Sequence, residues 1–149
     1  MTEDLKRLLQ KELQLLEDAS QVLEYSFTKC SRIGLKSDYS PEELESFESL
    51  CSRFARLSDI MTQKIFRLLA EIALEQPGTV RDRINRAEKW NLIESAEDFV
   101  AIRIVRNDIA HEYLPEAIRD LFKKVMKLTP ALLKGVALTT DYCSRLKSC

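Results

Sequence analysis

The chain has 149 residues, of which 45% are hydrophobic and 32% are charged, and it contains only 3 glycines and 4 prolines. This composition excludes a disordered chain and a turn-rich β-sandwich, and the length predicts a single domain over residues 1–149. The formal net charge of −1 excludes a protein that holds long nucleic acid through its overall charge alone.

Hydrophobic residues recur at spacings of three and four from the start of the chain, which predicts a first helix over about residues 2–29. The second helix is predicted to begin at Ser40-Pro41, because the Ser40 side chain can cap free backbone N–H groups and Pro41 suits the first helical position. Glu43 completes a capping box there. This long helix is expected to end near Gln76-Pro77-Gly78.

Further helical segments follow with the same spacing. A short helix is predicted after Thr79, and a fourth begins near Ser95 and must end before Pro115. A last helical region begins near Pro115, and Pro130 is expected to break or restart it. The chain contains no strand pattern and no internal repeat. The sequence therefore predicts an all-α antiparallel bundle of five or six helices, two of them long.

Basic residues gather in the last part of the chain. Residues 115–149 carry seven basic and three acidic side chains, which is a local net charge of +4 in a chain of net charge −1. This excess is either a nucleic-acid-binding patch or the solvated face of a helix, and the sequence leaves both interpretations open.

The four cysteines form no C-x-x-C pair, and a single histidine cannot complete a Cys/His zinc set. We therefore expect free thiols in a reducing compartment, with no metal and no other cofactor. The N-terminal residues lack the apolar core of a signal peptide, and no run approaches the length of a membrane span. These patterns predict a cytoplasmic protein with no membrane partner.

The single histidine lies in a polar stretch near the end of the fourth predicted helix, residues 106–113 (RNDIAHEY). Asn107 and His111 are four residues apart and share a face of the helix. Arg106 and His111 are five apart, about 140° around the axis, but a long arginine side chain can still reach the imidazole. Three groups that suit phosphate chemistry are therefore predicted to meet at one helix end.

Each of these groups has a plausible chemical role. The guanidinium of Arg106 can bind a phosphate through its forked donors. The imidazole of His111 can take a proton from a ribose 2′-hydroxyl or donate one to a leaving oxygen, and Asn107 can hold the imidazole or contact the phosphate. Such a set cleaves RNA by internal attack and needs no metal. The alternative for His111 is a helix-end residue that pairs with backbone carbonyls or with Glu112.

Internal phosphoryl transfer moves two protons, yet the chain has one histidine. Either another residue supplies the second proton-transfer group, or two chains do. A symmetric dimer that brings two sets of Arg106 and His111 together meets this need, so we predict a homodimer with a composite cleft. Tyr113 is either a half-buried anchor at the helix end or a site of nucleotidyl transfer, which would add charge and bulk beside Arg106.

Arg106, His111 and Tyr113 follow each other in the order R-x4-H-x-Y, with Asn107 directly after the arginine, on a late helix of a small bundle. This pattern resembles the HEPN domain, and more narrowly the HEPN toxin of HEPN/MNT (type VII) toxin–antitoxin pairs. Residues 54–59 (FARLSD), on the long second helix, are also similar to that subgroup. The resemblance covers essentially the whole chain.

The resemblance implies a homodimeric endoribonuclease that acts on RNA, with Arg106 and His111 as its catalytic pair. It also implies a cognate minimal nucleotidyltransferase antitoxin, which transfers AMP from ATP to the tyrosine that matches Tyr113. Asp59 either lines the cleft or pairs with a backbone N–H or with Arg56 on the helix surface. The weak overall basicity departs from what RNA binding favours.

Two other interpretations remain. The chain can be a non-catalytic module that binds a nucleotidyltransferase, or a structural helical adaptor that buries residues 106–113 in a dimer interface. The presence of both Arg106 and His111 favours the enzyme over these alternatives.

Overall fold

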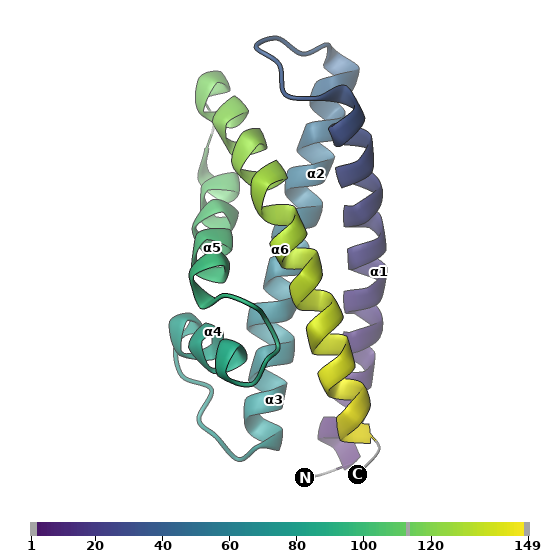
Figure 1. The fold of residues 1–149 in the computed structure, drawn as a ribbon, viewed down its shortest axis with the longest axis vertical. Coiled ribbons are helices and arrows are strands. Elements are labelled where there is room, and N and C mark those ends of the chain that lie inside the picture. The colour runs from purple at the N-terminus through teal and green to yellow at the C-terminus, as the bar shows by residue number, and fades with distance from the viewer. Residues whose placement is uncertain (1–2, 113, 148–149) are drawn as a thin grey trace.

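The computed structural model describes residues 3–112 and 114–147, and every regular element among them is a helix (Figure 1). The prediction of an all-α bundle is confirmed. In chain order the elements are α1 (Glu3–Ile33), α2 (Pro41–Asp59), a π-helical segment η1 (Ile60–Ile65), α3 (Phe66–Ile72), α4 (Val80–Lys89), α5 (Ala96–His111) and α6 (Pro115–Lys147). No helix in the described part of the chain is long and apolar enough to cross a membrane.

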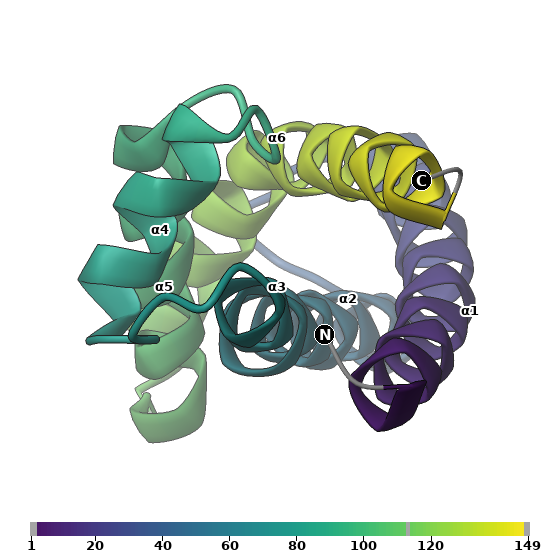
Figure 2. The same cartoon turned by 90° about the horizontal axis from the view of Figure 1, so that it is seen from below.

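Three long rods form the body of the bundle: α1, the continuous α2–η1–α3 helix, and α6 (Figure 1). The rod of α1 runs antiparallel to both of the others, whereas the α2–η1–α3 rod and α6 run in the same direction (Figure 1). The helix α1 packs chiefly on α2, and α5 packs chiefly on α6. The short α4 lies across one end of α5, as the view along the bundle shows (Figure 2). The helix α5 therefore packs against both α2 and α6.

Local capping explains where three of the helices begin. The Ser40 hydroxyl accepts from the Glu43 N–H, and the Glu43 carboxylate accepts from the Ser40 N–H, which is the predicted capping box. Thr79 and Asp82 form the same reciprocal pair at the start of α4. Ser95 caps α5 by accepting from the backbone of the third helical residue. These starts are confirmed because each depends on residues within one helical turn.

Aromatic packing fixes the helices around the start of α6. Tyr39, Phe47 and Phe122 form a cluster in which ring centroids lie 4.9–5.7 Å apart. Farther along, Gly135 lets α6 approach α5 closely, since a Cβ there would lie 2.8 Å from Cζ of Phe99. Phe99 is itself fully buried. The close approach of α6 therefore fixes the first turn of α5 against the core.

Pro130 does not break the last helix, which runs without interruption from Pro115 to Lys147, so that prediction is wrong. An internal proline loses one backbone hydrogen bond and costs about 3 kcal/mol. Here Pro130 lies on the exposed side, while Val125, Thr129 and Leu132 are completely buried on the other. Burial of apolar side chains on both sides of the proline offsets that cost. The bundle accordingly has three long helical rods where the sequence predicts two.

Candidate active site

The last two turns of α5 carry the residues that the sequence singles out. Asn107 and His111 are exposed, whereas the Arg106 side chain is 28% exposed and turns toward α2. Tyr113 lies outside the described residues. The helix ends at His111, where the Glu112 N–H donates to the Asp108 carbonyl and closes the last turn.

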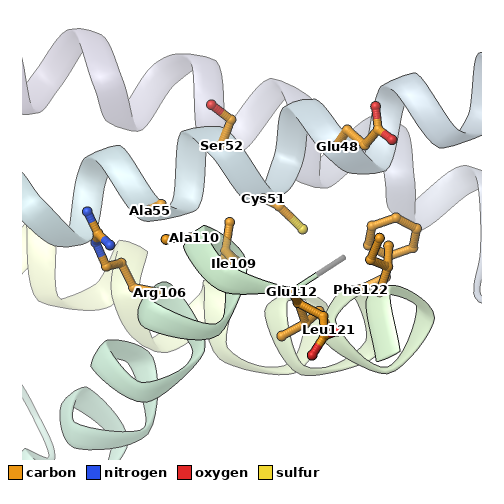
Figure 3. Close-up of a pocket in the computed structure, with 11 residues that line it drawn as sticks. Glu48, Cys51, Ser52, Ala55, Arg106, Ile109, Ala110, Glu112, Leu121 and Phe122 are labelled. Carbon is orange, nitrogen blue, oxygen red and sulfur yellow. The ribbon is translucent and has the colours of Figure 1, made fainter. Parts of the chain in front are cut away.

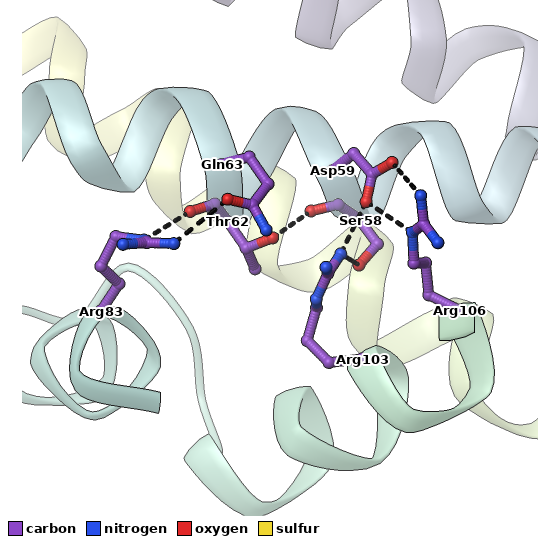
Figure 4. Close-up of polar contacts among 7 residues, drawn as sticks. All are labelled: Ser58, Asp59, Thr62, Gln63, Arg83, Arg103 and Arg106. Carbon is purple, nitrogen blue, oxygen red and sulfur yellow. Dashed lines mark hydrogen bonds and ion pairs between the residues drawn. The ribbon is translucent and has the colours of Figure 1, made fainter. Parts of the chain in front are cut away.

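Arg106 forms a bidentate ion pair with Asp59, the last residue of α2 (Figure 4). Its Nε donates to Asp59 Oδ1 at 2.8 Å, and its Nη2 donates to Oδ2 at 2.9 Å. Two parallel charge-assisted bonds fix the plane of the guanidinium as well as its position. Of the two interpretations of Asp59, the structure places it in the wall of a groove beside Arg106; it makes no bond to Arg56 among the described residues.

Arg103 is a member of this cluster that the sequence analysis missed. Its Nη1 donates to Asp59 Oδ1 at 2.7 Å and to the Ser58 hydroxyl at 3.1 Å, and its side chain is only 14% exposed. A signal for it exists, because Arg103 precedes Arg106 by three residues and therefore shares its face of α5. One carboxylate thus holds two guanidinium groups.

The pKa shifts reflect this arrangement. Partial burial of Asp59 opposes its ionisation, but the hydrogen bonds from Arg106 and Arg103 outweigh burial and lower the pKa of the carboxyl group below its ordinary value. The hydrogen bonds to Asp59 raise the pKa of Arg106, and this effect is larger than that of burial, which lowers it. The ion pair is therefore charged throughout the physiological pH range.

The structure does not bring the Arg106 guanidinium against the imidazole. Within the described residues, the side chains of Asn107 and His111 make no hydrogen bond or ion pair, so His111 does not pair with Glu112 there. Asp59 draws the guanidinium toward α2, whereas His111 is exposed and follows Arg106 by five residues, about 140° around a regular helix. Two of the five N–H donors of Arg106 are engaged by Asp59, and three remain for a ligand.

Hollows lie on both sides of Arg106. One of about 360 Å³ opens between α2, α5 and α6 and is mainly apolar, with Cys51, Ile109 and Phe122 in its wall and Arg106 at one end (Figure 3). The other, of about 540 Å³, lies between α2, η1 and α5, and four of its lining residues are cationic. Arg106 is the wall that the two hollows share, so a ligand bound to it can extend either way.

Two buried cysteines, Cys51 in the wall of the apolar hollow and Cys30 on α1, have raised pKa values. Burial raises the pKa of Cys51 to about 12, with smaller effects of Cys30 and Glu48, and burial raises the pKa of Cys30 to about 11. A thiol with such a pKa is almost entirely protonated at neutral pH and reacts slowly. Cys30 and Cys51 are free and buried, as expected for thiols that serve in packing, and Cys143 is also buried.

The basic residues of α6 mostly pair with nearby acids at the surface. Lys124 contacts Asp120 at 3.1 Å, and Arg145 contacts Asp141 at 3.3 Å, both one helical turn away. These side chains are at least half exposed. Of the two interpretations of residues 115–149, this pairing favours a solvated helix face.

Within residues 3–112 and 114–147, no group of three or more His, Cys, Asp or Glu side chains is placed to hold a metal ion. No protein-family model, curated protein or solved structure matches this chain. The resemblance to HEPN toxins therefore rests on the residues of the R-x4-H-x-Y pattern and on the all-helical fold.

Proposed function

We propose that this protein is a metal-independent endoribonuclease, the toxin of a type VII (HEPN/MNT) toxin–antitoxin pair, with Arg106 and His111 as its catalytic residues. The observation that carries the proposal is the Arg106 guanidinium, which a carboxylate orients at the shared wall of two hollows. Such an oriented, partly solvated guanidinium suits the binding of a phosphodiester. The only histidine of the chain is exposed near it on the same helix.

The reaction that fits these residues is internal transesterification. A ribose 2′-hydroxyl loses its proton to an imidazole and attacks the adjacent phosphorus, while the bond from phosphorus to the 5′-oxygen breaks. An imidazolium protonates that leaving oxygen, so the products are a 2′,3′-cyclic phosphate and a 5′-hydroxyl. Arg106 stabilises the charge on the phosphoryl oxygens. Asn107 is exposed and positions the imidazole or the phosphate.

The experiment that tests this activity uses purified protein and an end-labelled single-stranded RNA in excess EDTA. We expect fragments that end in a 2′,3′-cyclic phosphate, and absence of cleavage under these conditions refutes the enzyme. A non-catalytic module that binds a nucleotidyltransferase is the second candidate, because the Arg106 guanidinium does not contact His111 among the described residues. That candidate predicts no cleavage but a stable complex with the nucleotidyltransferase.

A homodimer is part of the proposal, since each chain offers a single imidazole. The exposed face of α5 supports it: Ile104 is 57% exposed and lies on the same face as Asn107 and His111, and Leu114 just beyond the helix is 65% exposed. Two exposed apolar side chains that flank a polar motif suit a self-complementary interface.

The double variant Ile104→Asp/Leu114→Asp is expected to elute as a monomer and to lose RNA cleavage, because two substitutions per chain place four charges in a symmetric interface. Tyr25→Asp is the matched control, since Tyr25 is also 65% exposed but lies on α1. Size-exclusion chromatography with light scattering measures the mass. A wild-type monomer with full activity would refute the composite cleft.

The proposal also includes a cytoplasmic location and control by a nucleotidyltransferase antitoxin that transfers AMP to Tyr113. Incubation with that partner and ATP is expected to increase the intact mass by one AMP and to stop RNA cleavage. Tyr113→Phe is expected to stay unmodified and active, because it lacks the hydroxyl that accepts the phosphate. Addition of AMP to Tyr113→Phe contradicts this site. Intact-mass spectrometry and the EDTA cleavage assay supply both readouts.

A further inference from the structure

The cationic hollow beside Arg106 has a composition unlike the rest of the chain. We call this hollow the groove. It is lined by Arg56, Asp59, Ile60, Gln63, Lys64, Arg103 and Arg106. Four cations and one carboxylate give it a formal charge of +3, although the whole chain has a net charge of −1. Positive charge is therefore concentrated next to the proposed catalytic arginine.

Two of these four cations form no ion pair with another described residue. Asp59 is shared by Arg103 and Arg106, whereas the exposed side chains of Arg56 and Lys64 have no ion-pair partner among the described residues. In a regular α-helix, two residues eight apart point about 80° away from each other. The wider turn of η1 takes up part of this angle, so Arg56 and Lys64 face the same groove.

A further cation, Arg83, is buried behind the wall of the groove. Arg83 is only 6% exposed and donates to the Thr62 carbonyl and the Gln63 side chain (Figure 4). It also donates to the Gly78 carbonyl, and all three acceptors are neutral. Burial, and then the nearby charges of Arg67, Arg103 and Arg86, lower its pKa. A guanidinium remains protonated despite such a shift. Arg83 therefore adds a fixed positive charge behind Gln63, itself a lining residue of the groove.

We propose that the groove binds the backbone phosphates of a single RNA strand next to the phosphate held by Arg106. This inference rests on the proposed ribonuclease activity, and it names the surface that holds the substrate. Arg56 and Lys64 contact phosphates directly. Arg103 and Arg83 keep their hydrogen bonds within the protein and add to the positive electrostatic potential of the groove. Phosphate contacts of this kind carry no base preference. A local groove also explains how a chain with a net negative charge can hold RNA.

The test measures binding of a fluorescein-labelled 20-nucleotide RNA by anisotropy over a range of salt concentrations. All proteins carry His111→Ala, so that the RNA stays intact. Arg56→Ala/Lys64→Ala is expected to bind on the order of tenfold more weakly at low salt. Its plot of log K against log salt should be shallower by about 1.4, which is the change for two lost contacts to a single strand. The loss should be equal for oligo(A) and oligo(U).

Lys123→Ala/Lys127→Ala is the matched control, because it removes the same charge from exposed positions on α6. It is expected to keep the affinity and salt dependence of the parent. The proposal is wrong if the groove variant binds RNA like the parent, if the control is weakened equally, or if the parent binds no RNA.

Cleavage of RNA in EDTA is measured in parallel with proteins that retain His111. If the protein cleaves RNA but Arg56→Ala/Lys64→Ala does not weaken RNA binding, only the groove proposal is wrong. If that variant weakens RNA binding but the protein does not cleave RNA, only the proposed ribonuclease activity is wrong. If the groove variant binds RNA normally but no longer binds an acidic nucleotidyltransferase, the surface serves that partner and the RNA proposal is refuted.

Discussion

His111→Ala is expected to cut RNA 10²–10⁴-fold more slowly than the wild-type protein, with little change in stability, because it removes the proposed proton-transfer group. The side chain is exposed and makes no hydrogen bond or ion pair with another described residue, so its removal disturbs no packing. The measurement is the single-turnover rate on a labelled RNA in EDTA. In a composite cleft the loss is large, since one substitution removes both imidazoles of the dimer.

A matched control comes from the other end of the same helix. Glu97→Ala, like His111→Ala, replaces an exposed hydrophilic side chain by alanine. Glu97→Ala is expected to cleave at the wild-type rate. Mixed dimers of wild-type and His111→Ala chains offer a further check, because each retains only one imidazole. Equal rates for His111→Ala and the wild type would exclude His111 from the chemistry.

Asp59→Asn is expected to have the second-largest effect, because it removes the charge that holds Arg106 and Arg103. A misplacement of about 1 Å in a catalytic group costs roughly 10²-fold in rate, and we expect a loss of this order. If Asp59 acts by positioning Arg106, Asp59→Asn should slow cleavage no further in an Arg106→Ala background. Additive losses in rate would contradict a positioning role.

The same variant has a predictable effect on stability. A broken pair costs 3–5 kcal/mol when buried, but the Asp59 side chain is 36% exposed, so screening reduces our expectation to about 1–2 kcal/mol. Because the pKa of Asp59 is lowered in the folded state, its contribution is complete above the unfolded carboxyl pKa of about 3.9. It is lost as the pH falls through the folded pKa.

The wild type and Asp59→Asn should therefore differ in free energy of unfolding at pH 7 and converge as the pH falls below about 4. Urea unfolding followed by circular dichroism measures this difference. An equal difference at pH 7 and pH 3 would show that the carboxylate contributes nothing through its charge.

The fold class was predictable because its signals are local. Hydrophobic spacing identifies the face that each helix buries, and the capping residues Ser40, Thr79 and Ser95 satisfy backbone groups within one turn. Neither signal needs knowledge of a neighbouring helix. Pro130 shows the limit of this reasoning, because the local cost of a proline was correct in sign but was outweighed by burial on the core side of α6.

The candidate site divides in the same way. The sequence by itself determined an all-helical chain whose single histidine follows Arg106 on one helix, since these facts depend on residue identity and helical spacing. Only the tertiary structure decided where the guanidinium points. Asp59 lies 47 positions earlier in the chain, and the packing of α5 on α2 brings its carboxylate within 2.8 Å of Arg106.

The groove likewise depends on long-range packing. Arg56 and Lys64 come from one helix, Arg103 and Arg106 from another, and the π-helical turn of η1 sets the phase between the first two. A hydrophobic pattern constrains the apolar side of a helix but leaves such charged side chains undetermined. Which charges meet was therefore decided by the angle and register at which α2 and α5 pack, because those two quantities depend on the whole core.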